Sequence, residues 1–152
     1  MAEAVFRRAV REDLEAIVWL LGDDPLGSRR ERLALPLEPR YVQAFDALVR
    51  DPNQLLAVAA DAEMVAGCLQ LTFVPGLSRL GMWRGQIESV RIAASHRGGG
   101  LGRRFLLWAI DQCRERGCGL VQLTTDKTRP DALRFYESLG FEASHHGLKL
   151  NL

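Results

Sequence analysis

Four glycines and three arginines are crowded into the ten residues 95–104, SHRGGGLGRR. Glycine has no Cβ atom, so a run of glycines lets backbone N–H groups approach a ligand closely. Where such a run leads into a helix, the N–H groups of the first turn and the helix dipole favour a bound anion. Arginine side chains add charge-assisted hydrogen bonds to phosphate. The segment is therefore a candidate site for a pyrophosphate-bearing ligand.

Two common phosphate-binding motifs do not fit the spacing of this segment. A P-loop requires a lysine directly after its last glycine, and the only lysines of the chain are Lys127 and Lys149. A dinucleotide-binding Gly-x-Gly-x-x-Gly motif that starts at Gly98 requires a glycine at position 103, where Arg103 stands. A tight turn with solvated arginines would explain the glycines equally well. Other parts of the sequence have to decide between a turn and an anion site.

Apolar patterns place the glycine segment between a strand and a helix. Residues 84–95 predict the strand, and four apolar positions predict a helix over about 101–116 that ends at Gly117: Leu101, Phe105, Trp108 and Ala109. Downstream, the patterns predict a strand in 119–127, a helix in 129–140 and a final strand or hairpin arm in 141–152.

The first half of the chain predicts the rest of one sheet and its helices. We expect, in order, a strand in 4–10, a helix in 12–22, a proline-interrupted loop in 23–39, a helix in 41–49 and a hairpin in 54–76. This mixture predicts an α+β (mixed α/β) fold built on a single sheet. The sequence shows no repeat and no linker, so we expect a single domain over 1–152.

Composition narrows the classes of partner. Hydrophobic residues make up 47% and charged residues 26%, as in globular proteins, and the net charge of +1 gives no basic field for nucleic acid. The three cysteines lack metal-ligand spacing, and His145 and His146 have no spaced partner, so we expect reduced thiols, no metal and a cytoplasmic protein. The N-terminal apolar stretch is interrupted by charges, which predicts neither a signal peptide nor a membrane span.

Two motifs in the same order resemble the GNAT acyltransferase superfamily. The residues RGGGLG at 97–102 match its [Arg/Gln]-x-x-Gly-x-[Gly/Ala] signature, within a segment similar to its strand, pyrophosphate loop and helix. A second segment, RPDALRFYESLGFEASHHGLKL, resembles the family's Ala-x-x-Phe-Tyr-x-x-x-Gly-Phe motif. The opening FRRAVREDLEAI is similar to its first strand and helix, so the resemblance covers nearly the whole chain.

The resemblance implies a fold, an acyl donor and a set of donor-binding residues. The fold would be a single mixed, mostly antiparallel sheet with two splayed parallel strands, flanked by helices. The donor would be acetyl-CoA, with its pantetheine arm bonded to the backbone of Val90, Arg91 and Ile92. Its pyrophosphate would be held by main-chain N–H groups of seven residues: Arg97, Gly98, Gly99, Gly100, Leu101, Gly102 and Arg103. Transfer would be direct, within a ternary complex and without a cysteine acyl-enzyme.

Two residues are candidates for proton transfer. Tyr136 matches the family tyrosine that protonates the departing CoA sulfur, and packing beside Phe135 is the alternative role. Glu88 lies on the strand that leads into the glycines and would take the proton of the amine directly or through water. The alternatives for Glu88 are an exposed strand carboxylate and an anchor for the substrate ammonium group.

Strand alternation makes a prediction about the surroundings of Glu88. A period of two puts four residues on one face of the strand: Gln86, Glu88, Val90 and Ile92. Ser89 and Arg91 would then point to the other face. Arg129 stands where many family members have an asparagine, which puts the usual polar contact near the pantetheine arm in doubt.

The sequence indicates the acceptor of the acyl group less directly than the donor. The family's acceptor regions hold seven polar or aromatic candidates here: Arg29, Arg30, Arg32, Arg40, Tyr41, His145 and His146. The arginines would orient an acidic small amine, or they are simply solvated. The leading hypothesis is N-acetylation of a small primary amine, and the tail is similar to that of aminoalkylphosphonate acetyltransferases. The alternatives are a protein lysine or N-terminal acetyltransferase and a noncatalytic acyl-CoA-binding domain. A homodimer and a monomer are both compatible with the sequence.

Overall fold

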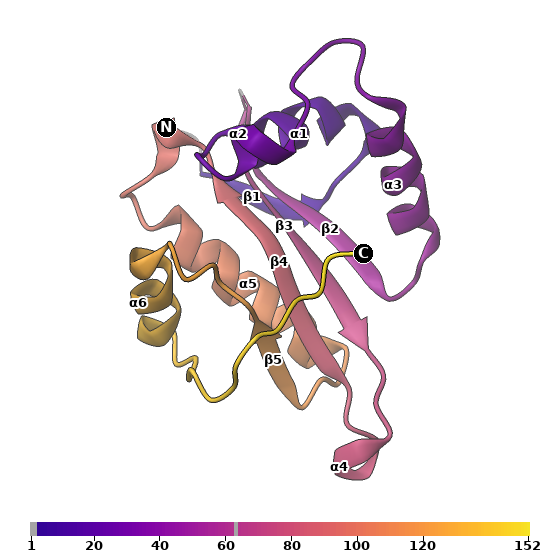
Figure 1. The fold of residues 1–152 in the computed structure, drawn as a ribbon, viewed down its shortest axis with the longest axis vertical. Coiled ribbons are helices and arrows are strands. Elements are labelled where there is room, and N and C mark those ends of the chain that lie inside the picture. Colours follow the sequence, from indigo (N-terminus) through magenta and orange to yellow (C-terminus); the bar gives the residue numbers. More distant parts are fainter. Residues whose placement is uncertain (1–2, 63) are drawn as a thin grey trace. The chain divides into compact units, whose positions relative to one another are not determined.

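The computed structural model describes residues 3–62 and 64–152, which divide into two compact units, Met1–Gln122 and Leu123–Leu152. The elements follow one another as β1 (Val5–Arg8), η1 (Arg11–Asp13), α1 (Leu14–Gly22), α2 (Gly27–Arg30), α3 (Pro39–Arg50), β2 (Gln54–Ala60), β3 (Val65–Val74), α4 (Ser78–Gly81), β4 (Arg84–Ile92), η2 (Ala94–His96), α5 (Leu101–Glu115), β5 (Leu120–Leu123) and α6 (Pro130–Ser138) (Figure 1).

The five strands form one sheet in the order β1-β2-β3-β4-β5. The first four strands pair antiparallel, and β5 joins β4 in parallel. Figure 1 shows β4 between β3 and β5, with the β3–β4 hairpin extending to the short turn α4. The predicted α+β (mixed α/β) class, with a mostly antiparallel sheet flanked by helices, is confirmed.

Helix α5 covers one face of the sheet. Phe105 and Ala109 of the helix are fully buried, and the Phe105 ring stacks on Phe6 of β1 with centroids 5.1 Å apart. Gly85 of β4 lies so close to the Cys113 thiol of α5 that a Cβ atom there would overlap its Sγ. The apolar stripe that predicts this helix from the sequence is therefore its sheet-facing side.

Helices α1 and α3 cover the opposite face. Ile17 and Val18 of α1 pack in one buried cluster with Phe45 of α3, Val58 of β2 and Cys68 of β3. The start of α1 is fixed by an ion pair in which Asp13 is buried and Arg7 is partly exposed. Arg7 donates two hydrogen bonds to the Asp13 carboxylate, at 2.7 and 3.1 Å, and the backbone N–H of Val10 donates a third. These bonds stabilise the charged carboxylate and lower the pKa of Asp13.

The predicted alternation along β4 is wrong at its C-terminal half. Cys68 of β3 pairs with Arg91, and Gln70 pairs with Glu88, so the two strands advance by different numbers of residues between these pairs. The extra residue forms a β-bulge at Ser89, which has a left-handed backbone with φ of 56°. As a result, Glu88 and Arg91 share the face of Cys68 and Gln70, and Ile92 lies on the other face, opposite Gly67.

The smaller unit contains helix α6 and the segment that follows it. The rings of Phe135 and Tyr136 meet edge to face, and Tyr136 also contacts the Phe141 ring. The expected final strand in 141–152 is wrong for the single chain, since the described residues of this segment form no strand. Among the described residues, no helix is long and apolar enough to cross a membrane.

Candidate active site at the start of helix α5

The glycine segment forms an open turn between β4 and α5. Gly98 and Gly100 have left-handed backbones with φ of 83° and 80°, a conformation that residues with a Cβ atom rarely adopt. A Cβ atom added at Gly98, Gly99 or Gly100 would meet no atom within 4 Å. Gly98 and Gly100 are thus required by backbone conformation rather than by crowding, and the space beside all three glycines is open to a ligand.

The backbone N–H groups of residues 98–103 lack backbone acceptors within the described part of the chain. After Arg97, the next backbone donor in the described chain is Arg104, whose N–H bonds to Gly100 O at 3.1 Å. No side chain caps α5, and its first turn contains no acidic residue. A helix of 15 residues therefore presents unused donors and the positive end of its dipole at an exposed surface.

Both sides of this turn are held in place. On the strand side, His96 Nε2 lies 3.0 Å from Asp61 Oδ2, and Arg97 Nε donates to Ile92 O at 3.0 Å. On the helix side, the Leu101 side chain is only 4% exposed and anchors the first turn in the core. The N–H groups are therefore arranged before any anion arrives, which reduces the ordering cost of binding.

The arginines of the segment keep exposed positions around the turn. Arg97 lies 3.8 Å from the Asp23 carboxylate, and Arg104 bonds to Glu3 at 3.2 Å. Arg103 is exposed at the start of the helix. Ion pairs of this kind on the surface are weak and exchange readily for a bound anion.

The C-terminal half of strand β4, which contains the Ser89 bulge, leads into this turn. Arg91 is largely buried, donates from Nη1 to Val90 O at 2.9 Å and places Nε 3.4 Å from Asp24 Oδ2 after α1. The carbonyl groups of Val90 and Ile92, predicted to bind the pantetheine arm, thus already accept one arginine hydrogen bond each. A carbonyl oxygen has two lone pairs, so each retains capacity for a second donor.

Glu88 is exposed on a polar part of the sheet face. Its cross-strand neighbour is Gln70, whose Nε2 donates to Gln54 Oε1 at 3.0 Å. One pair further along, Gln86 Oε1 accepts from Gln122 Nε2 at 3.1 Å. Gln70 was not among the residues predicted for the site. A polar residue among the apolar residues of β3 could have indicated it. The bulge at Ser89 could not be predicted in this way, because a left-handed residue in a strand is usually glycine and serine does not indicate one.

The other predicted residues have mixed outcomes. In the smaller unit, Tyr136 is half-buried, and His145 Nδ1 lies 2.7 Å from the Ser144 hydroxyl. In the larger unit, Arg32 and Arg40 both bond to the Glu38 carboxylate, at 2.6 and 3.1 Å. These two arginines are therefore already engaged with an acidic partner, which weakens their case as anchors for an acidic acceptor.

The cysteine thiols are poorly suited to nucleophilic attack. Burial raises the pKa of Cys68 to about 12 and that of Cys113 to about 11. The pKa of Cys118 is also raised by burial. Because the thiolate is the nucleophile, these thiols stay protonated and unreactive at neutral pH.

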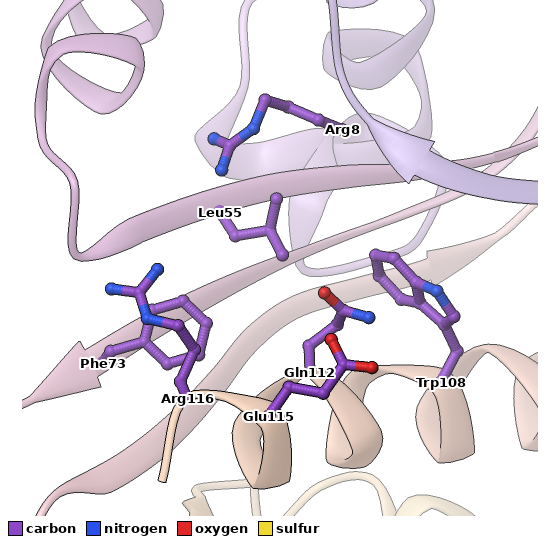
Figure 2. A pocket seen from close by; sticks show the side chains of 7 residues that line it. All are labelled: Arg8, Leu55, Phe73, Trp108, Gln112, Glu115 and Arg116. Carbon is purple, nitrogen blue, oxygen red and sulfur yellow. The ribbon is translucent and has the colours of Figure 1, made fainter. Parts of the chain in front are cut away.

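A cavity of about 230 Å³ lies at the opposite end of α5 (Figure 2). Its lining consists of Arg8, Leu55, Phe73, Trp108, Gln112, Glu115 and Arg116. The Arg116 guanidinium group lies over the Phe73 ring at 4.2 Å and donates to Pro52 O at 2.9 Å. Arg8 donates to Gln54 O at 3.2 Å. Both cations are held by the scaffold, so this cavity has less capacity for a ligand anion than the turn at Gly100.

Comparison with known proteins identifies the family. The model of the acetyltransferase (GNAT) family matches residues 14–141, which include β4, the glycine turn and α6. The chain belongs to the GNAT family. The predictions of a GNAT fold and of an acyltransferase are confirmed. Among the described residues, no group of three or more His, Cys, Asp or Glu side chains is placed to hold a metal ion.

Individual GNAT relatives carry names of different kinds. An aminoalkylphosphonate N-acetyltransferase of Salmonella typhimurium is 33% identical over 69% of this chain and 68% of its own length. A glucosamine 6-phosphate N-acetyltransferase of Trypanosoma brucei is 34% identical over 58% of each chain. A crystal structure from Bacillus halodurans, named a transcriptional regulator, is 51% identical with a TM-score of 0.96, and the match covers 98% of this chain and 99% of the other.

Proposed function

We propose that this GNAT protein transfers the acetyl group of acetyl-CoA to a primary amine of a small metabolite, directly within a ternary complex. The observation that carries the proposal is the row of backbone N–H groups at 98–103, which have no backbone acceptor among the described residues and surround an open turn at the start of α5. A pyrophosphate offers several acceptor oxygens and two or more negative charges to this row.

The donor-binding residues follow from the same geometry. The N–H groups of Gly98–Gly100 and Leu101–Arg103 would bind the pyrophosphate. Arg97, whose N–H already bonds to Ala94 O at 3.4 Å, would add charge through its side chain, as would Arg103. The backbone beside the Ser89 bulge would bind the pantetheine arm. The bulge leaves Val90 outside the register pairs with β3, so its backbone groups are suited to this role, and Arg91 and Ile92 would continue the row.

The proposed chemistry needs one proton acceptor and one proton donor. The nitrogen lone pair of the amine attacks the thioester carbonyl while Glu88 takes a proton from the nitrogen, directly or through water. The carbon–sulfur bond then breaks, and the Tyr136 hydroxyl donates its proton to the departing thiolate. The high thiol pKa values of Cys68 and Cys113 support direct transfer rather than a cysteine acyl-enzyme.

A small amine is favoured as the acceptor by the names of the relatives and by the surroundings of Glu88. Two of the relatives are named for a phosphonate amine and an amino sugar phosphate. Glu88 is a carboxylate suited to an ammonium group, and the amide of Gln70 beside it is suited to further polar groups of a small molecule. The paired state of Arg32 and Arg40 argues against these two residues as the site of an acceptor anion.

A thiol-release assay with acetyl-CoA tests the proposal. We expect turnover with at least one small primary amine from a panel of aminoalkylphosphonates, amino sugar phosphates, amino acids and polyamines. Initial rates at varied concentrations of both substrates should give intersecting lines, because both must be bound before transfer. Parallel lines would indicate a covalent intermediate and would contradict direct transfer.

The same assay separates the two alternatives. Turnover only with lysine-containing or N-terminal peptides would establish a protein acetyltransferase. Tight acetyl-CoA binding without turnover on any amine would favour a noncatalytic acyl-CoA-binding domain. This last alternative has support in the Bacillus halodurans structure, which is named a transcriptional regulator.

Replacement of Tyr136 by phenylalanine tests the proposed acid. Tyr136→Phe keeps the ring that contacts Phe135 and Phe141 and removes only the hydroxyl group. We expect kcat to fall about 100-fold while the acetyl-CoA Kd, measured by calorimetry, stays within about threefold. An unchanged kcat would remove Tyr136 from the mechanism.

The single domain over 1–152, the cytoplasmic location and the homodimer remain predictions from the sequence.

A further inference from the structure

The cavity at the C-terminal end of α5 is lined by opposite charges that do not pair with one another (Figure 2). Arg8 of β1, Glu115 of α5 and Arg116 just after the helix all line this space of about 230 Å³. Within the described part of the chain, no ion pair joins Glu115 to either arginine. Charges that face one cavity without neutralising each other remain available to a ligand.

Both arginines are tethered to one short segment at the start of β2. Arg8 Nη1 donates to Gln54 O at 3.2 Å, and Arg116 Nη2 donates to Pro52 O at 2.9 Å and to Asn53 Oδ1 at 3.2 Å. These bonds use one nitrogen of each guanidinium group. The other two nitrogens of each group donate to no acceptor in the described chain, so two oriented cations can still bind an anion.

The carboxylate of Glu115 occupies an electrostatically unfavourable position. Glu115 is the last residue of α5, where the negative end of the helix dipole disfavours an anion. The adjacent Arg114 is already paired with Asp111, at 2.6 Å. The side chain of Glu115 has no hydrogen bond or ion pair within the described residues. A cation in the cavity would be attracted by both the carboxylate and the end of the helix.

The remaining walls of the cavity are apolar or carry single polar groups. Leu55 and Phe73 come from the sheet. Figure 2 shows Trp108, Gln112 and Glu115 on one side of α5, as their helical spacing requires. The indole N–H of Trp108 and the amide of Gln112 have no hydrogen-bond partner among the described residues. The cavity therefore combines apolar walls with polar groups that no other side chain uses.

The cavity is separate from the proposed site of acetyl transfer. Phe73 lies three residues after Gln70 in a regularly paired part of β3, so the two side chains point to opposite faces of the sheet. Glu88 pairs with Gln70 and shares its face. The glycine turn is also distant, because the 15 residues of α5 separate the two ends of the helix by roughly 20 Å. A small ligand in the cavity would contact neither Glu88 nor the glycine turn.

We propose that this cavity is a second ligand site, which binds a small zwitterion of the amino acid type. The carboxylate of the ligand lies between Arg8 and Arg116, its ammonium group lies against Glu115, and its apolar side chain packs beside Leu55 and Trp108. The 230 Å³ of the cavity is below the roughly 300–1,000 Å³ of sites for drug-sized ligands, which suits a molecule of amino acid size. This inference does not depend on the proposed acetyl transfer.

An NMR titration with L-leucine tests the proposal at the cavity itself. The chain has three tryptophans, so its spectrum contains three indole N–H signals, and Trp108→Phe identifies the one from Trp108. We expect millimolar L-leucine to shift the Trp108 signal and to leave those of Trp19 and Trp83 nearly unchanged. An unchanged Trp108 signal would overturn the proposal, even where other signals show that L-leucine binds near Glu88.

Two further probes test whether the site requires both charges. Isocaproate lacks the ammonium group of L-leucine, and isoamylamine lacks the carboxylate. Each should bind about 10-fold more weakly than L-leucine, because each loses one charge-assisted contact. Isocaproate that binds as tightly as L-leucine would indicate a simple anion site, and isoamylamine that does so would indicate a simple cation site. Either result would contradict a zwitterion site.

A charge-neutralising variant assigns the ammonium contact. Glu115→Gln should weaken L-leucine binding about 10-fold and leave isocaproate binding nearly unchanged, because only the contact with the ammonium group is lost. Glu15→Gln makes the same change at an exposed position of α1 and is the matched control, with the L-leucine affinity of the wild type. Wild-type affinity in Glu115→Gln, or an equal loss in Glu15→Gln, would count against the proposed site.

Discussion

Helix α5 has a left-handed glycine at each end, Gly100 with φ of 80° and Gly117 with φ of 78°. A Cβ atom would meet nothing within 4 Å at either position. At the C-terminal end, the N–H groups of Gly117 and Cys118 bond to the carbonyls of Arg114 and Cys113, which closes the helix in a Schellman motif. At the N-terminal end, the N–H groups of 98–103 have no backbone acceptor within the described chain.

The arginines at the two ends differ in the same way. Arg116 stacks on Phe73 and bonds to the backbone beside β2, whereas Arg103 is exposed at the open turn. Similar residue types therefore terminate a helix at one end and leave donors for a ligand at the other. A candidate anion site is therefore marked by backbone N–H groups without acceptors, rather than by the presence of glycine and arginine.

Replacing Gly100 or Gly117 by valine should give the largest difference in acetyl-CoA affinity between the two ends of α5. Both variants place a β-branched residue in a left-handed conformation, so both should lose about 1–2 kcal/mol of unfolding free energy. Only Gly100→Val also brings a side chain into the proposed pyrophosphate site, and we expect its acetyl-CoA Kd to rise about 100-fold by calorimetry. An equal loss of affinity in Gly117→Val would mean that helix stability, not the turn, controls binding.

Hydrogen exchange should show the same contrast without any mutation. Binding of CoA should slow exchange of the amides in 98–103 by on the order of 10-fold or more, because these N–H groups gain acceptors. The amides of Gly117 and Cys118 already have acceptors and should change little. Protection only at the C-terminal end would instead place CoA near the cavity of Figure 2.

Arginine replacements should give the smallest effects, of a different kind at each end. Arg103→Ala should raise the acetyl-CoA Kd about 3–10-fold, because an exposed arginine adds modestly to the backbone contacts. Arg116→Ala should leave the Kd unchanged and lower the free energy of unfolding by about 1–2 kcal/mol, through its lost stacking and hydrogen bonds. Calorimetry measures the Kd, and urea unfolding measures the free energy of unfolding. A raised Kd in Arg116→Ala with an unchanged Kd in Arg103→Ala would place the acetyl-CoA site at the C-terminal end of α5 instead.

The sequence was most informative where local pattern and structure coincide. The apolar stripe of α5, the proline at the start of α6 and the paired apolar runs of β2 and β3 predicted these elements correctly. The pattern failed at Ser89, since a bulge depends on the register with β3 and not on local propensity. It also failed at 141–152, where the described residues form no strand.

The sequence by itself determined the family, because the glycine and tyrosine motifs are contiguous and their spacing is directly readable. It also predicted an anion site at the junction of β4 and α5. Only the tertiary structure decided that Arg91 shares the face of Glu88, that Arg32 and Arg40 are paired with Glu38, and that the N–H groups of 98–103 remain unused. These features depend on which distant residues meet, and that is set by strand register and packing rather than by neighbours along the chain.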